Sequence, residues 1–254
     1  MQKPVVKASR EWICIRLLTY ESESEYEFME ELLGVQKGTL PNTVFCMLAP
    51  DGKTRLSRPS RSPSFFRTPE NLATQMQRLA AGYKSTVPDS FVAPIPLIHR
   101  VDLALNVAAS DNRPLIVAYH SNTDELNTIL NSVKHVIWEP EFIGQFMIAA
   151  TTQPEDLKPL SGGTGEPGLY VIEPDEYGVS GKVTRFVDAQ KVDVLAKTTL
   201  ALGLNSFQPF EKNHQQHIRS GYLFGIEWDT VVPESDPMSV QAKQRYKARF
   251  NNRP

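Results

Sequence analysis

The chain has only two cysteines among its 254 residues, Cys14 and Cys46, and each stands in an apolar run. Two cysteines cannot build the disulfide framework that stabilises small secreted domains. Their wide separation also fits no zinc-binding spacing. Because both neighbourhoods are apolar, we expect both thiols to be small core residues.

Long apolar runs and a strong charge of one sign are also missing. No segment approaches the roughly twenty apolar residues that cross a bilayer, and the N-terminal residues lack the apolar centre of a signal peptide. The formal net charge of −2 at pH 7 argues against general affinity for nucleic acid. These absences predict a cytoplasmic protein that binds neither membrane nor nucleic acid.

Patterns typical of hydrolases, nucleotide enzymes and metalloenzymes are not found either. The chain contains no phosphate-binding loop and no serine–histidine–acid pattern. His214 and His217 are spaced by one helical turn, but no carboxylate or thiol at a suitable spacing completes a metal site. We therefore expect no metal and no cofactor.

The chain does contain enough apolar sequence for real cores. Hydrophobic residues make up 41% and charged residues 22%, which is ordinary for a globular protein. The length allows one large or two small domains. Three prolines, Pro88, Pro94 and Pro96, predict a linker near the middle.

The clearest pattern lies between residues 112 and 185. Apolar residues at steps of three and four predict an amphipathic helix, capped by Thr123 or Asp124. Short apolar runs bounded by turn residues predict strands. The predicted strands are residues 114–121, 145–150, 169–172 and 182–187, followed by a further helix.

This order of strand, helix, strand, proline-containing loop, hairpin and helix resembles the thioredoxin-like superfamily. In that family a strand beginning Lys-Pro leads to Cys-x-x-Cys at the first turn of a helix. Aligning Pro114 with that proline puts Asp124 and Asn127 where the two cysteines would stand. Pro167 takes the place of the cis-proline that precedes the third strand. The resemblance implies an α/β domain with a mixed central sheet flanked by helices.

The missing cysteines have a chemical meaning. Thiol–disulfide exchange needs an attacking thiolate and a second thiol that resolves the mixed disulfide, and a carboxylate and an amide cannot exchange electrons. The resemblance implies that an extended peptide binds beside the proline instead. The predicted contact patch consists of Tyr119, Asp124, Asn127, Glu166 and Pro167.

The first half is expected to repeat the back part of such a domain. A Pro-Asp turn at residues 50–52 aligns with the one at residues 173–175. The strand and helix that would carry Cys-x-x-Cys have no counterpart before Trp12. Either another segment or chain supplies them, or the sequence begins inside a longer chain that could hold a targeting segment. The predicted elements are strands at residues 10–20, 43–48 and 54–57 and helices at residues 22–33 and 69–82.

These patterns give a predicted division of the chain. Its parts are a partial thioredoxin-like domain at residues 1–86, a linker at 87–96, a thioredoxin-like domain at 97–207 with a helix at 97–109, and an extended C-terminal arm at 208–254.

A basic stretch at residues 57–64 is a further candidate contact. It carries Arg58 and Arg61 among serines and prolines, which suits either an anionic or acidic partner or a loop folded back on its own domain. The final residues, 239–253, are also basic. They fit either a solvated helix or a contact for an acidic surface.

The C-terminal arm supplies the last candidates. Tyr222, Phe224 and Trp228 form an aromatic segment that is expected to lie in a groove of this chain or of a neighbour.

The leading hypothesis is a redox-inactive, thioredoxin-like scaffold protein that binds a protein partner or forms a homo-oligomer. The alternative is a thioredoxin-like thiol–disulfide oxidoreductase whose catalytic segment is missing or atypical. That alternative needs Cys14 or Cys46 as an exposed thiol of low pKa. The absence of Cys-x-x-Cys favours a role that is not enzymatic.

Overall fold

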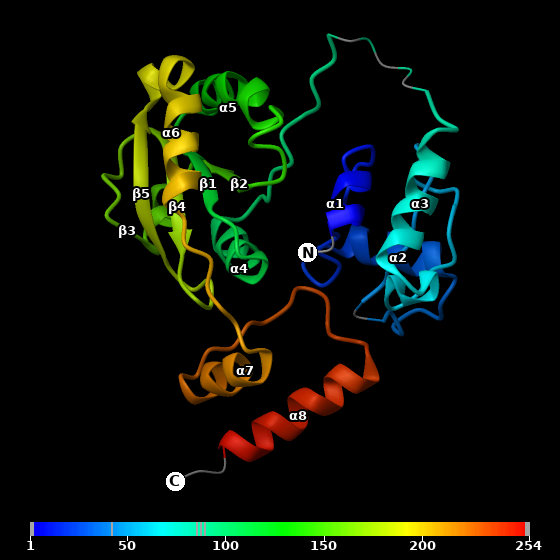
Figure 1. Cartoon of the computed structure of the whole chain (residues 1–254). Helices are drawn as coiled ribbons and strands as arrows, with labels where there is room; N and C mark the ends of the chain where they lie inside the picture. The colour runs from blue at the N-terminus through cyan, green and yellow to red at the C-terminus, as the bar shows by residue number, and fades with distance from the viewer. Residues whose placement is uncertain (1–2, 42, 85, 87, 89, 252–254) are drawn as a thin grey trace. The chain divides into compact units, whose positions relative to one another are not determined.

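The computed structural model describes residues 3–41, 43–84, 86, 88 and 90–251. These residues form a mixed α/β protein with eight α-helices and one five-stranded sheet (Figure 1). The chain divides into two compact units, Met1–Val87 with Tyr222–Pro254, and Pro88–Gly221. Val87 of the predicted linker and Arg253 of the predicted basic stretch lie outside the described residues.

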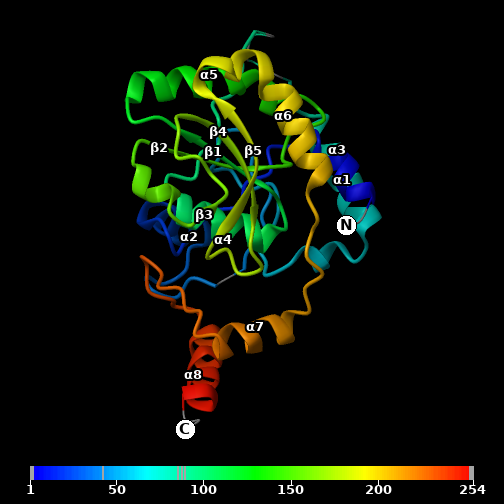
Figure 2. The ribbon, with the colours of Figure 1, turned by 90° about the vertical axis from the view of Figure 1, so that its left-hand side faces the viewer.

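The second unit contains the sheet. Its strands are β1 (Leu115–Tyr119), β2 (Met147–Thr151), β3 (Leu160–Ser161), β4 (Gly168–Pro174) and β5 (Gly181–Asp188). They lie in the order β2-β1-β4-β5-β3. The parallel pairs are β1 with β2 and β3 with β5, and the antiparallel pairs are β1 with β4 and β4 with β5. Figure 2 shows β4 and β5 from a second direction. The four predicted strands are confirmed, and the short β3 was not expected.

Helices cover both faces of this sheet (Figure 1). α5 (Thr123–Ile137) and α6 (Val192–Ser206) pack on one face, and α4 (Val101–Asp111) packs on the other. Successive residues of β1 belong to opposite cores, Ile116 to the α5 side and Val117 to the α4 side. Because a strand covered on both faces is apolar throughout, β1 is recognisable as a continuous apolar run.

Shorter elements connect these layers. The 3₁₀ helices are η2 (Pro154–Leu157) and η3 (Ala189–Lys191), and α7 (His214–Leu223) follows α6. The helix predicted at 97–109 begins only at Val101, because Ile98 instead forms a bridge to Ala149 of β2.

The first unit is built from helices. They are α1 (Lys3–Ser9), α2 (Glu23–Leu33), η1 (Pro63–Phe66), α3 (Pro69–Ala80) and α8 (Pro237–Asn251). The predicted helices at 22–33 and 69–82 are confirmed. Their caps are also those expected, since Ser22 Oγ accepts from Glu25 N at 3.4 Å and Thr68 Oγ1 accepts from Asn71 N at 3.2 Å. Residues of α1 and α3 share a small core consisting of Ala8, Met47, Leu72, Ala73 and Met76.

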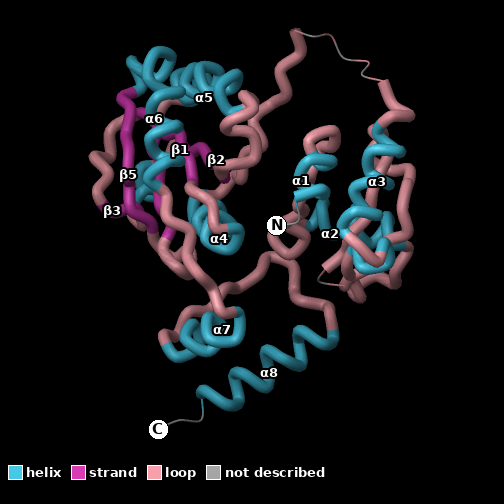
Figure 3. The backbone as a smooth tube through the Cα atoms, in the orientation of Figure 1, coloured by secondary structure: helices cyan, strands magenta, loops and turns pink. Residues whose placement is uncertain are grey.

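The strands predicted in the first unit are wrong. Its described residues contain none (Figure 3), and residues 43–60 form only two antiparallel bridges, Phe45 to Ser60 and Leu48 to Arg55. Ile13 and Ile15 are 89% and 74% exposed. A strand needs a partner for its backbone groups, and residues 10–20 have no such neighbour among the described residues.

None of the helices among the described residues has the length and apolarity that crossing a bilayer would require.

Candidate functional site

One end of the sheet brings several of the predicted residues together. Tyr119, the last residue of β1, pairs with Thr151 of β2 and with Gly168 of β4. Because β1 and β2 are parallel, both leave the sheet at this end, where the loop before β4 enters it. We call residues 119–127, 151–153 and 162–168 the sheet-end site.

The start of α5 is fixed by Asn122. Its Oδ1 accepts from the backbone N–H groups of Asp124 and Glu125 at 2.8 and 3.1 Å. Asn122 is therefore the N-cap, and the prediction of Thr123 or Asp124 is wrong by one or two positions. His120 Nδ1 in turn accepts from Asn122 N at 3.0 Å, so this nitrogen is an acceptor in the arrangement observed.

Asp124 and Asn127 lie side by side on the exposed surface of α5. Their separation of three residues places them one above the other on the helix. Both side chains are exposed. The Asp124 carboxylate makes no hydrogen bond or ion pair with another described residue, so it is available to a partner.

Glu166 and Pro167 lie at the end of a loop held from inside the unit. The Tyr170 hydroxyl donates to the Glu166 carbonyl, and Ala189 N donates to Pro167 O at 3.1 Å. Burial raises the pKa of the Tyr170 hydroxyl, which keeps it protonated and able to donate. The Glu166 side chain is exposed and Pro167 is half-buried.

The peptide bond before Pro167 is trans. The described residues contain no cis peptide bond. The expected cis-proline is therefore not found, although Pro167 does stand directly before β4.

Tyr119 is a core residue. It is only 6% exposed and belongs to the cluster between the sheet and α4. In a strand that is covered on both faces, even the terminal side chain lies under a helix or a neighbouring strand. Its predicted role as a contact residue is therefore wrong.

Gly168 is required by the geometry of this end. Its φ is +157°, and a Cβ built on it would lie 2.1 Å from the Val187 carbonyl oxygen. Our prediction named Glu166 and Pro167 but gave no role to Gly168, Asn122 or His120. The available signal was position, because polar residues that directly follow parallel strands gather at one edge.

The sheet-end site contains no thiol. Cys14 and Cys46 both belong to the first unit. Cys14 is exposed, which corrects the expectation of a core residue, and Cys46 is partly buried. Burial raises the pKa of the Cys46 thiol. The site therefore offers amide, imidazole, hydroxyl and carboxylate groups, which can recognise a ligand by hydrogen bonds and charge.

The predicted contacts of the C-terminal arm are made within the first unit. Trp228 Nε1 donates to Glu21 Oε1 at 2.7 Å, and Tyr222 stacks on Tyr246 with ring centroids 5.5 Å apart. Phe224 is 73% exposed. Of the two predicted positions for this arm, the structure gives the one on its own chain.

Arg58 and Arg61 also belong to the first unit. Arg61 pairs with Asp236 at 2.6 Å, so this basic stretch meets an acidic group of its own chain, while Arg58 is exposed.

His217 has neighbours in the second unit. Its Nδ1 lies 3.1 Å from Glu176 Oε1, and its ring stacks on Tyr177 at 4.4 Å. His214 is exposed. Nowhere in residues 3–84 or 90–251, as far as they are described, do three His, Cys, Asp or Glu side chains gather as a metal site would need.

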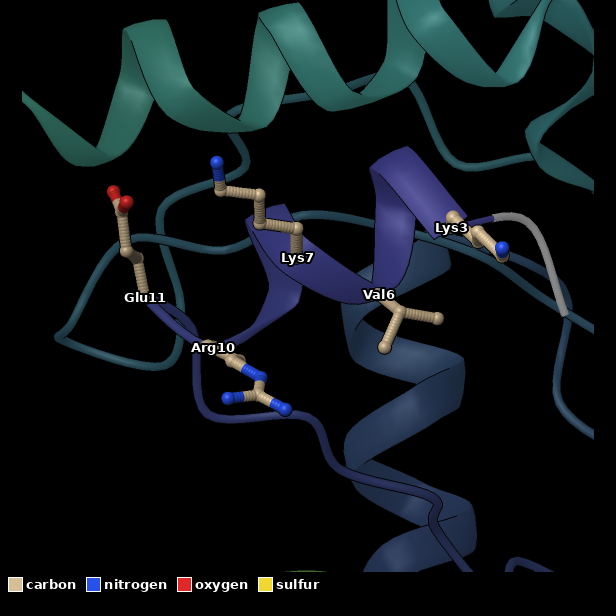
Figure 4. A pocket seen from close by; sticks show the side chains of 5 residues that line it. All are labelled: Lys3, Val6, Lys7, Arg10 and Glu11. Carbon is tan, nitrogen blue, oxygen red and sulfur yellow. The ribbon is translucent and has the colours of Figure 1, made fainter. Parts of the chain in front are cut away.

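A shallow depression of about 550 Å³ lies beside α1. Figure 4 shows that its side chains spread in different directions and do not converge on one point. It therefore has little of the character of a ligand site. The lining residues are Lys3, Val6, Lys7, Arg10 and Glu11.

The chain matches no protein-family model, and comparisons with curated proteins and with solved structures also give no match.

Proposed function

We propose that the second unit is a redox-inactive, thioredoxin-like domain and that the protein is a binding or scaffold protein. The order of the elements supports the proposal. A parallel β1–α5–β2 unit is followed by a loop, the antiparallel β4–β5 hairpin and α6, in a mixed sheet flanked by helices. The described residues of the first unit lack the strands of such a domain, so we do not extend the resemblance to them.

The observation that carries the binding role is the surface at the start of α5. Asp124 and Asn127 stand where the family's cysteines would be, and both are exposed. The register of Tyr119 with Gly168 brings the end of β1, which leads into α5, to the strand end that Glu166 and Pro167 precede. A carboxylate and an amide in these places support recognition in place of electron transfer.

The chemistry of the surface favours side-chain recognition of a basic partner. Asp124, Glu125 and Glu166 are exposed acids of the site, and complementary charge guides association. The Glu166 N–H already donates to Thr164 Oγ1 at 3.3 Å, and its carbonyl accepts from Tyr170. Because these backbone groups are occupied, strand addition at Glu166 is disfavoured, and the partner is expected to contact the acidic side chains.

The partner is either another protein or a second copy of this chain, and the proposed location is the cytoplasm. A photoreactive amino acid at position 127 of the full chain tests this. Cross-linked product from position 127, with none from exposed position 193 on α6, supports the sheet-end site. A product of twice the chain mass indicates self-association, and equal yields from both positions contradict the proposal.

An oxidoreductase remains the second candidate because Cys14 is exposed. Its thiol would have to act without a neighbouring cysteine in sequence and outside the α/β unit. The thiol experiment described below separates the two functions.

A further inference from the structure

The serine-rich loop at residues 57–64 holds a feature that the binding role does not use. Ser62 is followed by Pro63, and the two arginines of the loop, Arg58 and Arg61, are exposed. Ser62 has extended backbone angles, φ −156° and ψ 161°. Its hydroxyl makes only local contacts, donating to Ser64 Oγ at 2.7 Å and accepting from Ser64 N at 3.1 Å.

The neighbouring Arg61 fixes the beginning of α8. Its Nη2 lies 2.6 Å from Asp236 Oδ2; the arginine side chain is 61% exposed and the aspartate side chain 1% exposed. The other oxygen of Asp236 accepts from the N–H groups of Met238 and Ser239, each at 3.0 Å. One buried carboxylate thus caps α8 and binds the arginine beside Ser62.

We propose that Ser62 is a phosphorylation site for a proline-directed serine kinase, and that its phosphate competes with Asp236 for Arg61. In the covalent step the Ser62 hydroxyl oxygen bonds to the γ-phosphorus of ATP. The bond from that phosphorus to the β,γ-bridging oxygen breaks, ADP leaves, and the kinase's base takes the hydroxyl proton. The site lies in the first unit and stands apart from the binding role of the second.

A comparison within the chain favours Ser62 over other positions. The sequence contains one other Ser/Thr-Pro pair, Thr68-Pro69. Thr68 caps α3, whose residues Leu72 and Met76 are buried. By contrast, Pro63 opens a 3₁₀ turn of four residues with none buried. Such a turn opens at low cost, whereas opening the start of α3 would disturb the core.

The phosphate would act on Arg61 through charge. It brings about two negative charges and three acceptor oxygens to the residue next to Arg61. The exposed guanidinium can turn toward the phosphate, because only one end of its ion pair is buried. Asp236 then keeps its cap of α8 but loses this cation, and a buried carboxylate without its counter-charge is destabilised. The first turn of α8 should open more often.

The first experiment treats the full chain with ATP and a proline-directed serine kinase and maps the phosphate by mass spectrometry. We expect incorporation at Ser62, loss of incorporation in Ser62→Ala, and little effect of Thr68→Ala. Phosphate found only at Thr68, or no incorporation at all, overturns the proposal.

The second experiment measures hydrogen exchange of the amides of Met238, Ser239 and Val240 in the full chain. Phosphorylation should raise their exchange by about threefold to tenfold, as loss of one charged partner implies. Arg61→Ala should raise it without phosphate, and phosphate should then add nothing, since both act on one contact. Arg58→Ala is the matched control and should leave unphosphorylated exchange unchanged. Unchanged exchange in the phosphorylated protein, or a full response in Arg61→Ala, contradicts competition for Arg61.

Discussion

Tyr119 and Gly168 lie opposite each other at the end of the β1–β4 pair, one buried under α4 and the other with no room for a side chain. This pairing sets where β1 stops and where the loop of Glu166 and Pro167 joins the sheet. The start of α5 and the start of β4 therefore share one edge, and that edge presents acids and amides. The proposed binding role depends on this relationship.

Gly168→Ala should be among the most destabilising single changes in the second unit. Its Cβ would lie 2.1 Å from the Val187 carbonyl oxygen, so β4 and β5 would have to separate. We expect a loss of about 3 kcal/mol or more. Gly144→Ala is the control, since its φ is also positive at +70° but nothing lies within 4 Å; it should cost about 1 kcal/mol. Urea denaturation of both variants tests this, and equal losses would contradict the tight packing at Gly168.

Asn122→Ala should lower stability by about 1 kcal/mol, because two N–H groups lose their acceptor. Asn127→Ala, on the exposed surface of the same helix, should leave stability unchanged or slightly higher, as alanine favours helix. The comparison is made by urea denaturation with circular dichroism. A larger loss for Asn127→Ala would mean that the contacts at the start of α5 are misassigned.

Cys14 should react with a thiol reagent at pH 8 about tenfold faster than Cys46, because burial hinders Cys46 and raises its pKa. Single cysteine-to-serine variants assign the two rates. The same samples should show no catalysed disulfide reduction. Turnover that disappears in Cys14→Ser would instead establish the oxidoreductase function.

Asp175→Asn should destabilise the β4–β5 hairpin in a pH-dependent way. Burial acts to raise the pKa of Asp175, but hydrogen bonds from Ser180, Val179 and Tyr177 outweigh it and lower the pKa below its usual value. A lowered folded-state pKa means that the stabilisation is complete above the unfolded pKa of about 3.9 and is lost as pH falls through the folded one.

The difference between Asp175→Asn and the original protein should therefore be about 1 kcal/mol at pH 7, allowing for partial solvent screening. It should shrink toward zero below about pH 3. Urea denaturation at both pH values measures it. A difference that grows on acidification would show that the pKa of Asp175 is raised on folding.

The second unit was predictable because its signals are local and repeated. β1 is apolar at every position since both faces are covered, and α5 has Leu126, Ile129 and Val133 at helical spacing, all buried. The α5 cap was misplaced because Asn122, Thr123 and Asp124 are all good caps by type. Only the backbone course showed which side chain reaches the free N–H groups.

The first unit was less predictable because its strand-like segments lack partners. Residues 13–15 are apolar and β-branched, as in a strand, yet the isoleucines are exposed. Strand propensity describes how a residue fits a sheet, and it cannot supply the neighbouring strand. The pairing of Arg61 with Asp236 was likewise out of reach, since the two residues are 175 positions apart.

The most direct test of the binding role compares Asp124→Lys with Asp193→Lys in the full chain. Both aspartates stand exposed in the first turn of a helix of the second unit, so both changes disturb helix stability alike. Each tagged protein is used for affinity capture, with bound proteins quantified by mass spectrometry. We predict a set of bound proteins that falls about tenfold with Asp124→Lys and persists with Asp193→Lys. The same bound proteins in the same amounts for both variants would contradict the sheet-end site as the binding surface.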